Sequence, residues 1–250
     1  MAYRAPRHPH IEKHASHQNI SARVVGLVLI WGIVGIMALL AERSIPVQHL
    51  PWKTLSVIDP IGVATKAKAA RTGEDAAACR AVLAQGGLSF REVEETSADG
   101  TCQVRGALRI TGGMAPLRPA DVSMTCKETL AVSIWERQVV QPAAFEVLGE
   151  AVTAIDNYGS YACRNIYGLP TSRVSEHASA NALDVAGFRL ANGETISVLK
   201  DWNDPGPKGR FLRRVRDEGC RVFTTVLSPD YNAAHANHFH LDMGGEALCS

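Results

Sequence analysis

The pattern of hydrophobic and polar positions first separates an apolar run near the N-terminus from the rest of the chain. Residues Val24 to Ala41 contain no charged side chain over 18 residues. As a helix this run would be about 27 Å long, close to the thickness of the hydrocarbon core of a bilayer. No face of the helix would be polar, which disfavours a helix in the core of a soluble domain. The run therefore predicts a transmembrane helix that places the chain in a lipid bilayer.

The charges on either side of the run predict its orientation. Four basic side chains and one acidic side chain precede it, whereas only Arg43 and Lys53 carry positive charge in the twenty residues that follow. The positive-inside rule then puts the N-terminus in the cytoplasm and the rest of the chain outside. A cleaved signal peptide is the alternative, because Ala38 to Ala41 offers small residues near the end of the run.

The segments that flank the run are polar and proline-containing. Residues 1–23 include four histidines and little apolar material, and predict a disordered cytoplasmic tail. Prolines 46, 51 and 60 lie among scattered polar residues and predict a stalk linker over 42–71. The folded domain is then expected over 72–250.

Within 72–250 the pattern alternates between helical and strand periods. Helices are expected at residues 76–85, 123–139, 142–155 and 209–218. Strands are expected at residues 88–93, 102–110, 160–166, 182–190, 195–198, 221–226 and 238–242. Early helices followed by short strands predict an α+β domain with a mainly antiparallel sheet and flanking helices.

Charge and cysteine usage narrow the class of protein. The chain has 26 Lys and Arg against 25 Asp and Glu, and no basic block, so we expect no nucleic-acid partner. All six cysteines follow the apolar run, which is typical of an oxidising compartment. No C-x-x-C motif is present, which disfavours a cysteine zinc cluster. Proximity in the sequence favours the disulfides Cys79–Cys102, Cys126–Cys163 and Cys220–Cys249 among fifteen pairings.

Candidate chemistry is concentrated in two polar segments, residues 175–188 and 235–242. In the first, Asp184 alternates with Leu183 and Val185, so its carboxylate lies on the opposite face of the strand from these apolar neighbours. An unpaired carboxylate buried in so apolar a strand costs several kcal/mol. A metal ion is one of the few partners that would offset this cost.

The second segment places two histidines on one face of a strand. His238 and His240 are two residues apart, while Phe239 and Leu241 face the other way. If His177, Asp184 and His240 converge, they supply two nitrogens and one oxygen, which suits tetrahedral Zn²⁺ with a place left for water. A single histidine or aspartate is more often structural, but the two clusters together favour a metal.

The remaining polar residues of these segments are candidates for supporting roles. His238, beside the ligands, would act as general base, and His235 would stabilise a developing oxyanion. Asp242 would orient His240, the alternative being a surface or turn aspartate. No G-x-S-x-G motif and no G-K-S/T phosphate loop occurs, so a serine nucleophile and a P-loop have no candidate.

These motifs resemble a known family. From Cys79 to the C-terminus the chain resembles the bacterial extensin-like protein C-terminal family, through SYACR at 160–164, SEHASANALDVAGF at 175–188, FLRRV at 211–215, VLSPD at 226–230 and HANHFHLDM at 235–243. The spacing also resembles the zinc peptidase group of lysostaphin, D-alanyl-D-alanine carboxypeptidases, the murein endopeptidase and the Hedgehog domain.

The resemblance implies zinc ligation by His177, Asp184 and His240 and catalysis by His238, with His235 nearby. It also implies that Arg164 contacts a substrate carboxylate, although a structural salt bridge explains an arginine there equally well. Asn237 stands where the carboxypeptidases carry a catalytic glutamate. This departure favours an endopeptidase over a D,D-carboxypeptidase.

The expected function is therefore a zinc metallopeptidase acting on peptide bonds of peptidoglycan. The expected location is the bacterial inner membrane, with one span, a cytoplasmic N-terminus and a periplasmic catalytic domain. The main alternative is a non-catalytic zinc domain that binds the cell wall or an envelope protein. A disulfide-rich structural protein without metal is the third class.

Overall fold

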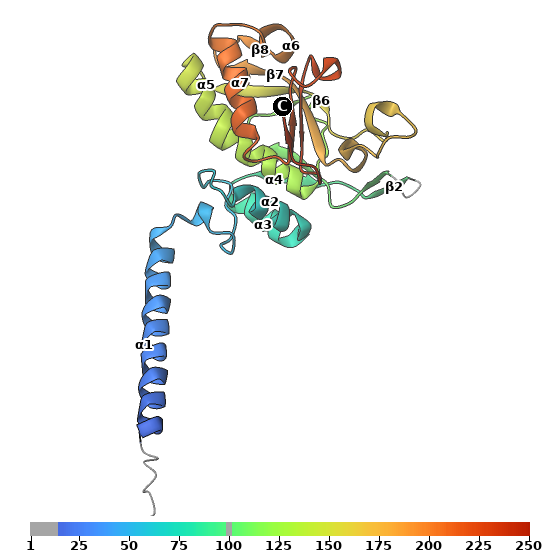
Figure 1. Ribbon diagram of the computed structural model, residues 1–250. Coiled ribbons are helices and arrows are strands. Elements are labelled where there is room, and N and C mark those ends of the chain that lie inside the picture. The colour runs from blue at the N-terminus through green and yellow to red at the C-terminus, as the bar shows by residue number, and fades with distance from the viewer. Residues whose placement is uncertain (1–14, 99–101) are drawn as a thin grey trace, which may run out of the picture. The chain divides into compact units, whose positions relative to one another are not determined.

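The computed structural model describes residues 15–98 and 102–250 and divides the chain into two units, Met1–Pro46 and Val47–Ser250. Helix α1 spans Ala15–Ser44 in the first unit (Figure 1). Its segment Ala22–Ser44 is long and apolar enough to cross a membrane, a property that a signal sequence shares. The apolar helix is thus confirmed, but the predicted tail is wrong for residues 15–23, which are helical. Residues 1–14 lie outside the described residues.

The second unit begins well before the predicted boundary at residue 72. Leu50, Leu55 and Val57 are buried, and helix α2, Thr65–Glu74, packs against helix α4, Cys126–Trp135. The ammonium group of Lys68 donates to the carbonyl oxygens of Val47 at 2.7 Å and Thr54 at 3.3 Å. The predicted stalk is therefore wrong from Val47 onward, because its buried residues are isolated along the sequence and show no helical or strand period.

The helices that follow begin and end at recognisable signals. Helix α3, Ala76–Gln85, starts at Asp75, whose side chain accepts the backbone N–H groups of Ala77 and Ala78. A π-helical turn, η2 at Glu136–Val140, joins α4 to helix α5, Gln141–Leu148. Gly149 then adopts a left-handed φ of 72°, which ends the helix. The expected helix through residue 155 is therefore wrong beyond this glycine, and a strand starts at Val152.

The main sheet carries the later strands in the order β11-β9-β10-β7-β6-β5, with β8 paired to β7. Its outer pairs β11–β9 and β5–β6 are parallel and the others are antiparallel, which confirms the expected α+β class. The strands of this sheet are β5 Leu117–Arg118, β6 Val152–Gly159, β7 Ala182–Leu190, β8 Thr195–Ser197, β9 Thr225–Leu227, β10 Phe239–Asp242 and β11 Leu248–Cys249.

Two short antiparallel pairs lie outside the main sheet. Strand β1, Ser89–Glu92, pairs with β4, Leu108–Gly112, and β2, Thr96–Ala98, pairs with β3, Cys102–Val104. The strand expected over 102–110 is thus two strands, separated near Gly106, which has φ 57°. The strand expected at 160–166 is wrong, because β6 ends at Gly159 and a loop with the 3-10 turn η3, Ile166–Gly168, follows.

The core lies between the main sheet and its helices. The Trp135 ring packs near Phe188 and Phe223, with ring centroids 6.0 Å apart in both pairs, and its indole N–H donates to the carbonyl oxygen of Val215 at 3.1 Å. Val215 belongs to helix α7, Pro207–Gly219, which lies beside α5 (Figure 1). A short helix α6, Val198–Asp201, precedes it. These helices support the sheet from which the candidate site projects.

The disulfides correct two of the three expected pairings. Cys79 on α3 pairs with Cys126 on α4, and Cys102 on β3 pairs with Cys163 in the loop after β6. Only the predicted Cys220–Cys249 bridge is confirmed. Proximity in the sequence failed because α3 packs against α4, which brings the Cα atoms of the first pair to 6.2 Å despite a separation of 47 residues.

Candidate metal centre

The first candidate ligand is held by a short turn beside the sheet. His177 lies in the 3-10 turn η4, Glu176–Ser179, and its backbone N–H donates to the hydroxyl of Ser175 at 3.3 Å. Its ring nitrogen Nδ1 is 2.7 Å from the carbonyl oxygen of Ser160. Because a carbonyl oxygen only accepts hydrogen bonds, Nδ1 carries a proton. Nε2, the other ring nitrogen, faces Asp184 and His240 and is the atom that could bind a metal.

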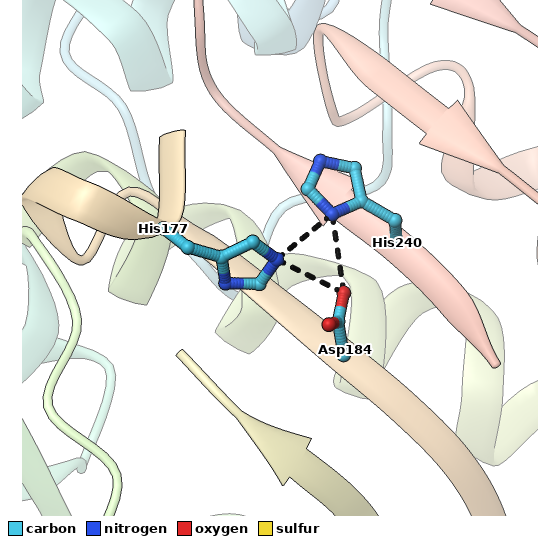
Figure 2. A group of neighbouring side chains, drawn as sticks. All are labelled: His177, Asp184 and His240. Carbon is cyan, nitrogen blue, oxygen red and sulfur yellow. Dashed lines mark hydrogen bonds and ion pairs between the residues drawn. The ribbon is translucent and has the colours of Figure 1, made fainter. Parts of the chain in front are cut away.

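The other two candidate ligands face each other across paired strands. Asp184 on β7 and His240 on β10 are direct partners in the antiparallel register, and their flanking residues Leu183, Phe239 and Leu241 are buried. Figure 2 shows both side chains turned toward His177. The atoms Asp184 Oδ1, His240 Nδ1 and His177 Nε2 are each 3.1 Å from the other two. Strand alternation therefore delivers both ligands to one point, as the sequence predicted.

The second ring nitrogen of His240 is also occupied. Nε2 of His240 is 2.9 Å from Asp242 Oδ2, while the other oxygen of Asp242 accepts the backbone N–H of Gly244 at 2.8 Å. A carboxylate behind a ligating imidazole fixes the ring and its tautomer. Asp242 is buried, so the structure brings it to His240 instead of exposing it as a turn residue.

The three ligand atoms fit a small divalent metal ion. Tetrahedral Zn²⁺ with bonds of about 2.0–2.1 Å separates neighbouring ligand atoms by about 3.3 Å, close to the separations found here. Among the described residues these three form a group whose nitrogen and oxygen atoms could hold a metal. The donor set of two imidazoles and one carboxylate also leaves a coordination place for water.

The charge state of the site follows from its contacts. Burial alone would raise the pKa of Asp184, but hydrogen bonds from His177 and His240 hold it below its usual range. Burial would lower the pKa of His240, but its hydrogen bonds to Asp184 and Asp242 raise that pKa to about 9. Without a bound metal, this pKa keeps His240 protonated at neutral pH.

Two further histidines border this cluster without joining it. His238 Nε2 lies 3.6 Å from Asp184 Oδ1, and Nδ1 of the same ring is 2.8 Å from Asn237 Oδ1. His235 ends the 3-10 turn η5, Ala233–His235, and its ring centroid is 5.2 Å from that of His238. Burial lowers the pKa of both rings, that of His235 to about 4, so both are neutral at pH 7.

A family model described as extensin-like protein C-terminus matches residues 77–250. The chain belongs to this family. No curated protein and no solved structure matches it. The match covers all three candidate ligands, so the cluster lies inside the extensin-like domain.

The cluster opens into a cavity of the extensin-like domain of about 280 Å³. Arg164 lines this cavity, and no ion pair of its guanidinium group is found in the described part of the chain. Arg173 and Glu246, which also line the cavity, form an exposed ion pair at 2.7 Å that links the loop after β6 to the C-terminal segment. The structure thus brings Arg164, His235 and His238 to one cavity with the candidate metal ligands.

Several residues that line this cavity or contact its histidines were not foreseen. The hydroxyl of Tyr158 faces Asn237 at 3.5 Å, and the hydroxyl of Tyr167 accepts from Asn232 at 2.8 Å. Tyr231 packs edge-on against His235, with ring centroids 5.5 Å apart. Tyr158 lies near the end of β6, Tyr167 in η3 and Tyr231 in a turn, and their sequences show no metal-site spacing, so only the fold reveals them. The sequence already placed Asn237 next to His238, but it did not predict the hydrogen bond between the Asn237 side chain and the His238 ring.

Proposed function

We propose that the extensin-like domain is a zinc-dependent hydrolase that cuts peptide bonds of peptidoglycan stem peptides or crosslinks. The observation that supports this most is the cluster of His177, Asp184 and His240, which offers three protein ligands and leaves a fourth coordination place for water. A neutral fourth histidine, His238, lines the same cavity. A structural zinc site has four protein ligands, whereas a catalytic site keeps a place for water. Zinc bound here would activate that water and polarise the scissile carbonyl.

In this mechanism His238 accepts the proton of the attacking water. Its Nδ1–H faces the side-chain oxygen of Asn237, so the lone pair of Nε2 points toward the ligand group, 3.6 Å from Asp184 Oδ1. The same nitrogen then delivers the proton to the amine nitrogen that leaves the scissile peptide bond. Asp242 contributes by holding His240 in a fixed orientation.

The presence of Asn237, in place of the catalytic glutamate of the carboxypeptidases, favours endopeptidase activity over D,D-carboxypeptidase activity. An amide side chain is no base, and this one is engaged by His238 and Tyr158. His238 is then the proton acceptor best placed for the reaction. The resemblance to the zinc peptidase group that includes the murein endopeptidase points the same way.

The cavity suits an anionic peptide. Arg164 lies close enough to His235 and His238 for its charge to lower their pKa values after the larger effect of burial. In the proposed complex its guanidinium group binds a carboxylate of the stem peptide, for which a planar bidentate partner is well suited. An Arg164→Lys variant keeps the positive charge but lacks the planar guanidinium group that binds a carboxylate through two hydrogen bonds. Its KM for the peptide should be higher than that of the wild type, with little change in kcat.

We also propose that the domain is periplasmic and held to the inner membrane by α1, with the N-terminus in the cytoplasm. Three disulfides in the folded unit and the basic residues that precede the apolar segment support this placement. Processing of the intact chain tests it. A mature protein that begins after residue 41 would replace the anchor with a cleaved signal peptide.

Two measurements test the proposed function. Elemental analysis of gently purified protein should find close to one zinc per chain, and less than about 0.2 would contradict the metal site. Purified sacculi should then be digested and their muropeptides identified by mass spectrometry. The wild-type protein should cleave peptide bonds in these muropeptides, and the His238→Ala variant should not.

The matched control for this assay is His49→Ala. His49 lies in the same folded unit, and its Nδ1 accepts a hydrogen bond from the backbone N–H of Val63. Neither residue lines the cavity. Muropeptides left unchanged by a zinc-loaded wild-type protein would favour the non-catalytic zinc domain. Equal cleavage by wild type and His238→Ala would remove His238 from the mechanism.

A further inference from the structure

Asn232 contacts His235 in a way that defines which ring nitrogen carries the proton. Its side-chain oxygen accepts the backbone N–H of Ala234 at 3.0 Å and lies 2.8 Å from Nδ1 of His235. A backbone N–H only donates, so the atom that it faces is the oxygen and not the amide nitrogen. That oxygen only accepts, and Nδ1 of His235 must therefore be the protonated nitrogen.

The asparagine is itself held by a residue from a distant part of the chain. Its amide nitrogen donates to the hydroxyl of Tyr167 at 2.8 Å, in the loop after β6. The rings of Tyr167 and Tyr231 pack edge-on against His235, with centroids 6.4 and 5.5 Å away. His235 is buried among these groups and has little freedom to turn its ring over. Side-chain packing and hydrogen bonding therefore agree on one orientation.

The remaining ring nitrogen, Nε2, is directed away from Asn232. No hydrogen bond to this atom is found within residues 15–98 and 102–250, and His235 lines the cavity beside the metal ligands. A neutral imidazole with its proton on Nδ1 offers only a lone pair at Nε2. It cannot donate a hydrogen bond from that atom to an oxyanion.

We propose that Asn232 is a positioning residue that fixes His235 as the Nδ1–H tautomer, which makes Nε2 a hydrogen-bond acceptor in the cavity. His235 then receives an N–H or O–H group of the bound molecule, such as a backbone amide of a stem peptide. This differs from the oxyanion role expected from the sequence. The peptide ligand rests on the proposed function, whereas the tautomer does not.

The test reads the tautomer directly. The full chain, with ¹⁵N-labelled histidine and one equivalent of zinc in detergent micelles, is examined by long-range ring correlation NMR, and His235→Gln assigns the signals. We expect a protonated Nδ1 and an unprotonated Nε2 at His235 in the wild type. A protonated Nε2 in the wild type would overturn the proposal.

Three variants separate a positioning role from a structural one. Asn232→Ser keeps an oxygen for the cap of η5 but cannot reach the ring, so more than half of His235 should move to the Nε2–H form. Asn232→Asp keeps both acceptor interactions and should keep the wild-type tautomer. Asn192→Ser is the matched control, because the Asn192 oxygen also accepts a backbone N–H two residues on, from Glu194 at 2.9 Å, and makes no hydrogen bond to a histidine among the residues that the structure describes.

The outcomes are decisive in either direction. An unchanged tautomer in folded Asn232→Ser, or a changed tautomer in Asn192→Ser or Asn232→Asp, would contradict the role of Asn232. If Asn232→Ser does not fold, the wild-type spectrum and the Asp variant still test the proposal. None of these measurements uses substrate, so a protein that fails to cut peptidoglycan can still pass them, and the two failures are distinguishable.

Discussion

The floor of the cavity and its wall are built by different kinds of interaction. The floor consists of Asp184 and His240, whose positions follow from the backbone register of β7 and β10. The wall consists of His235 and His238, which lie on turns and loops and are held by the side chains of Asn232 and Asn237. Both regions present imidazole nitrogens to the same space.

This difference suggests a division of labour. Strand pairing positions atoms within a few tenths of an ångström, which a metal ion requires of its ligands. Hydrogen bonds from side chains select a tautomer, which a group that accepts or relays protons requires. Substitutions on the floor should therefore change metal binding, and substitutions on the wall should change chemistry while metal stays bound.

The largest effect is expected from Asp184→Asn on the floor. The amide removes the only negative charge among the three ligands, so zinc should be lost at micromolar free metal. Competition with a fluorescent chelator measures the affinity. Asp156→Asn, which alters an exposed ion pair with Arg189 on the neighbouring strand, is the control and should bind zinc normally. Unaltered affinity of Asp184→Asn would mean that the metal lies elsewhere.

The next effect is expected from His238→Ala on the wall. Loss of a general base lowers the rate by roughly 10²–10⁴-fold, and the zinc content should stay near that of the wild type. The rate of crosslink cleavage and elemental analysis on the same sample measure both quantities. Zinc that disappears together with activity would make His238 a ligand and would erase the distinction between floor and wall.

A smaller effect is expected from Asp242→Asn, behind the floor. The amide weakens the hold on His240 Nε2, and groups that support a ligating histidine typically contribute about 10–100-fold in metal affinity. Chelator competition again gives the constant, with the exposed Asp217→Asn on α7 as the control. No change in affinity would show that strand register alone orients His240.

The smallest effect is expected from Tyr158→Phe, on β6 beside the wall residue His238. The ring still packs edge-on against His238, with centroids 5.9 Å apart, but the hydroxyl that faces Asn237 is gone. A net hydrogen bond of about 0.5–1.5 kcal/mol corresponds to a loss of roughly 2- to 10-fold in cleavage rate. Zinc content should not change. A loss as large as that of His238→Ala would make the tyrosine itself a participant in the reaction.

The same division explains what could be predicted from the sequence. Strand alternation placed Asp184 on the opposite face from its apolar neighbours, and β7 has the expected bounds 182–190. The strand expected over 238–242 begins at Phe239, so His238 lies in the loop before it and does not share a strand face with His240. The histidines of the wall were predicted, but the contacts that hold them could not be, because the hydrogen bond between Asn232 and Tyr167 joins segments 65 residues apart that carry no periodic pattern.

The errors in the fold have the same origin. Cys79 pairs with Cys126 because α3 packs on α4, a tertiary contact that sequence distance does not encode. Leu50, Leu55 and Val57 are too irregularly spaced to reveal that they are buried. The end of α5 is a different kind of error, because the signal for it lies in the local sequence. Gly149 ends the helix, but the apolar residues that follow it led to the prediction of a helix through residue 155.

Zinc K-edge X-ray absorption on the purified full chain tests the central claim most directly. Two imidazole nitrogens and one carboxylate oxygen from the protein, together with one exchangeable water oxygen, are predicted at about 2.0–2.1 Å. Substitution of His177 should remove one of the two imidazole signals. A spectrum with a fourth protein ligand, or with sulfur in the coordination sphere, would contradict an open site formed by His177, Asp184 and His240.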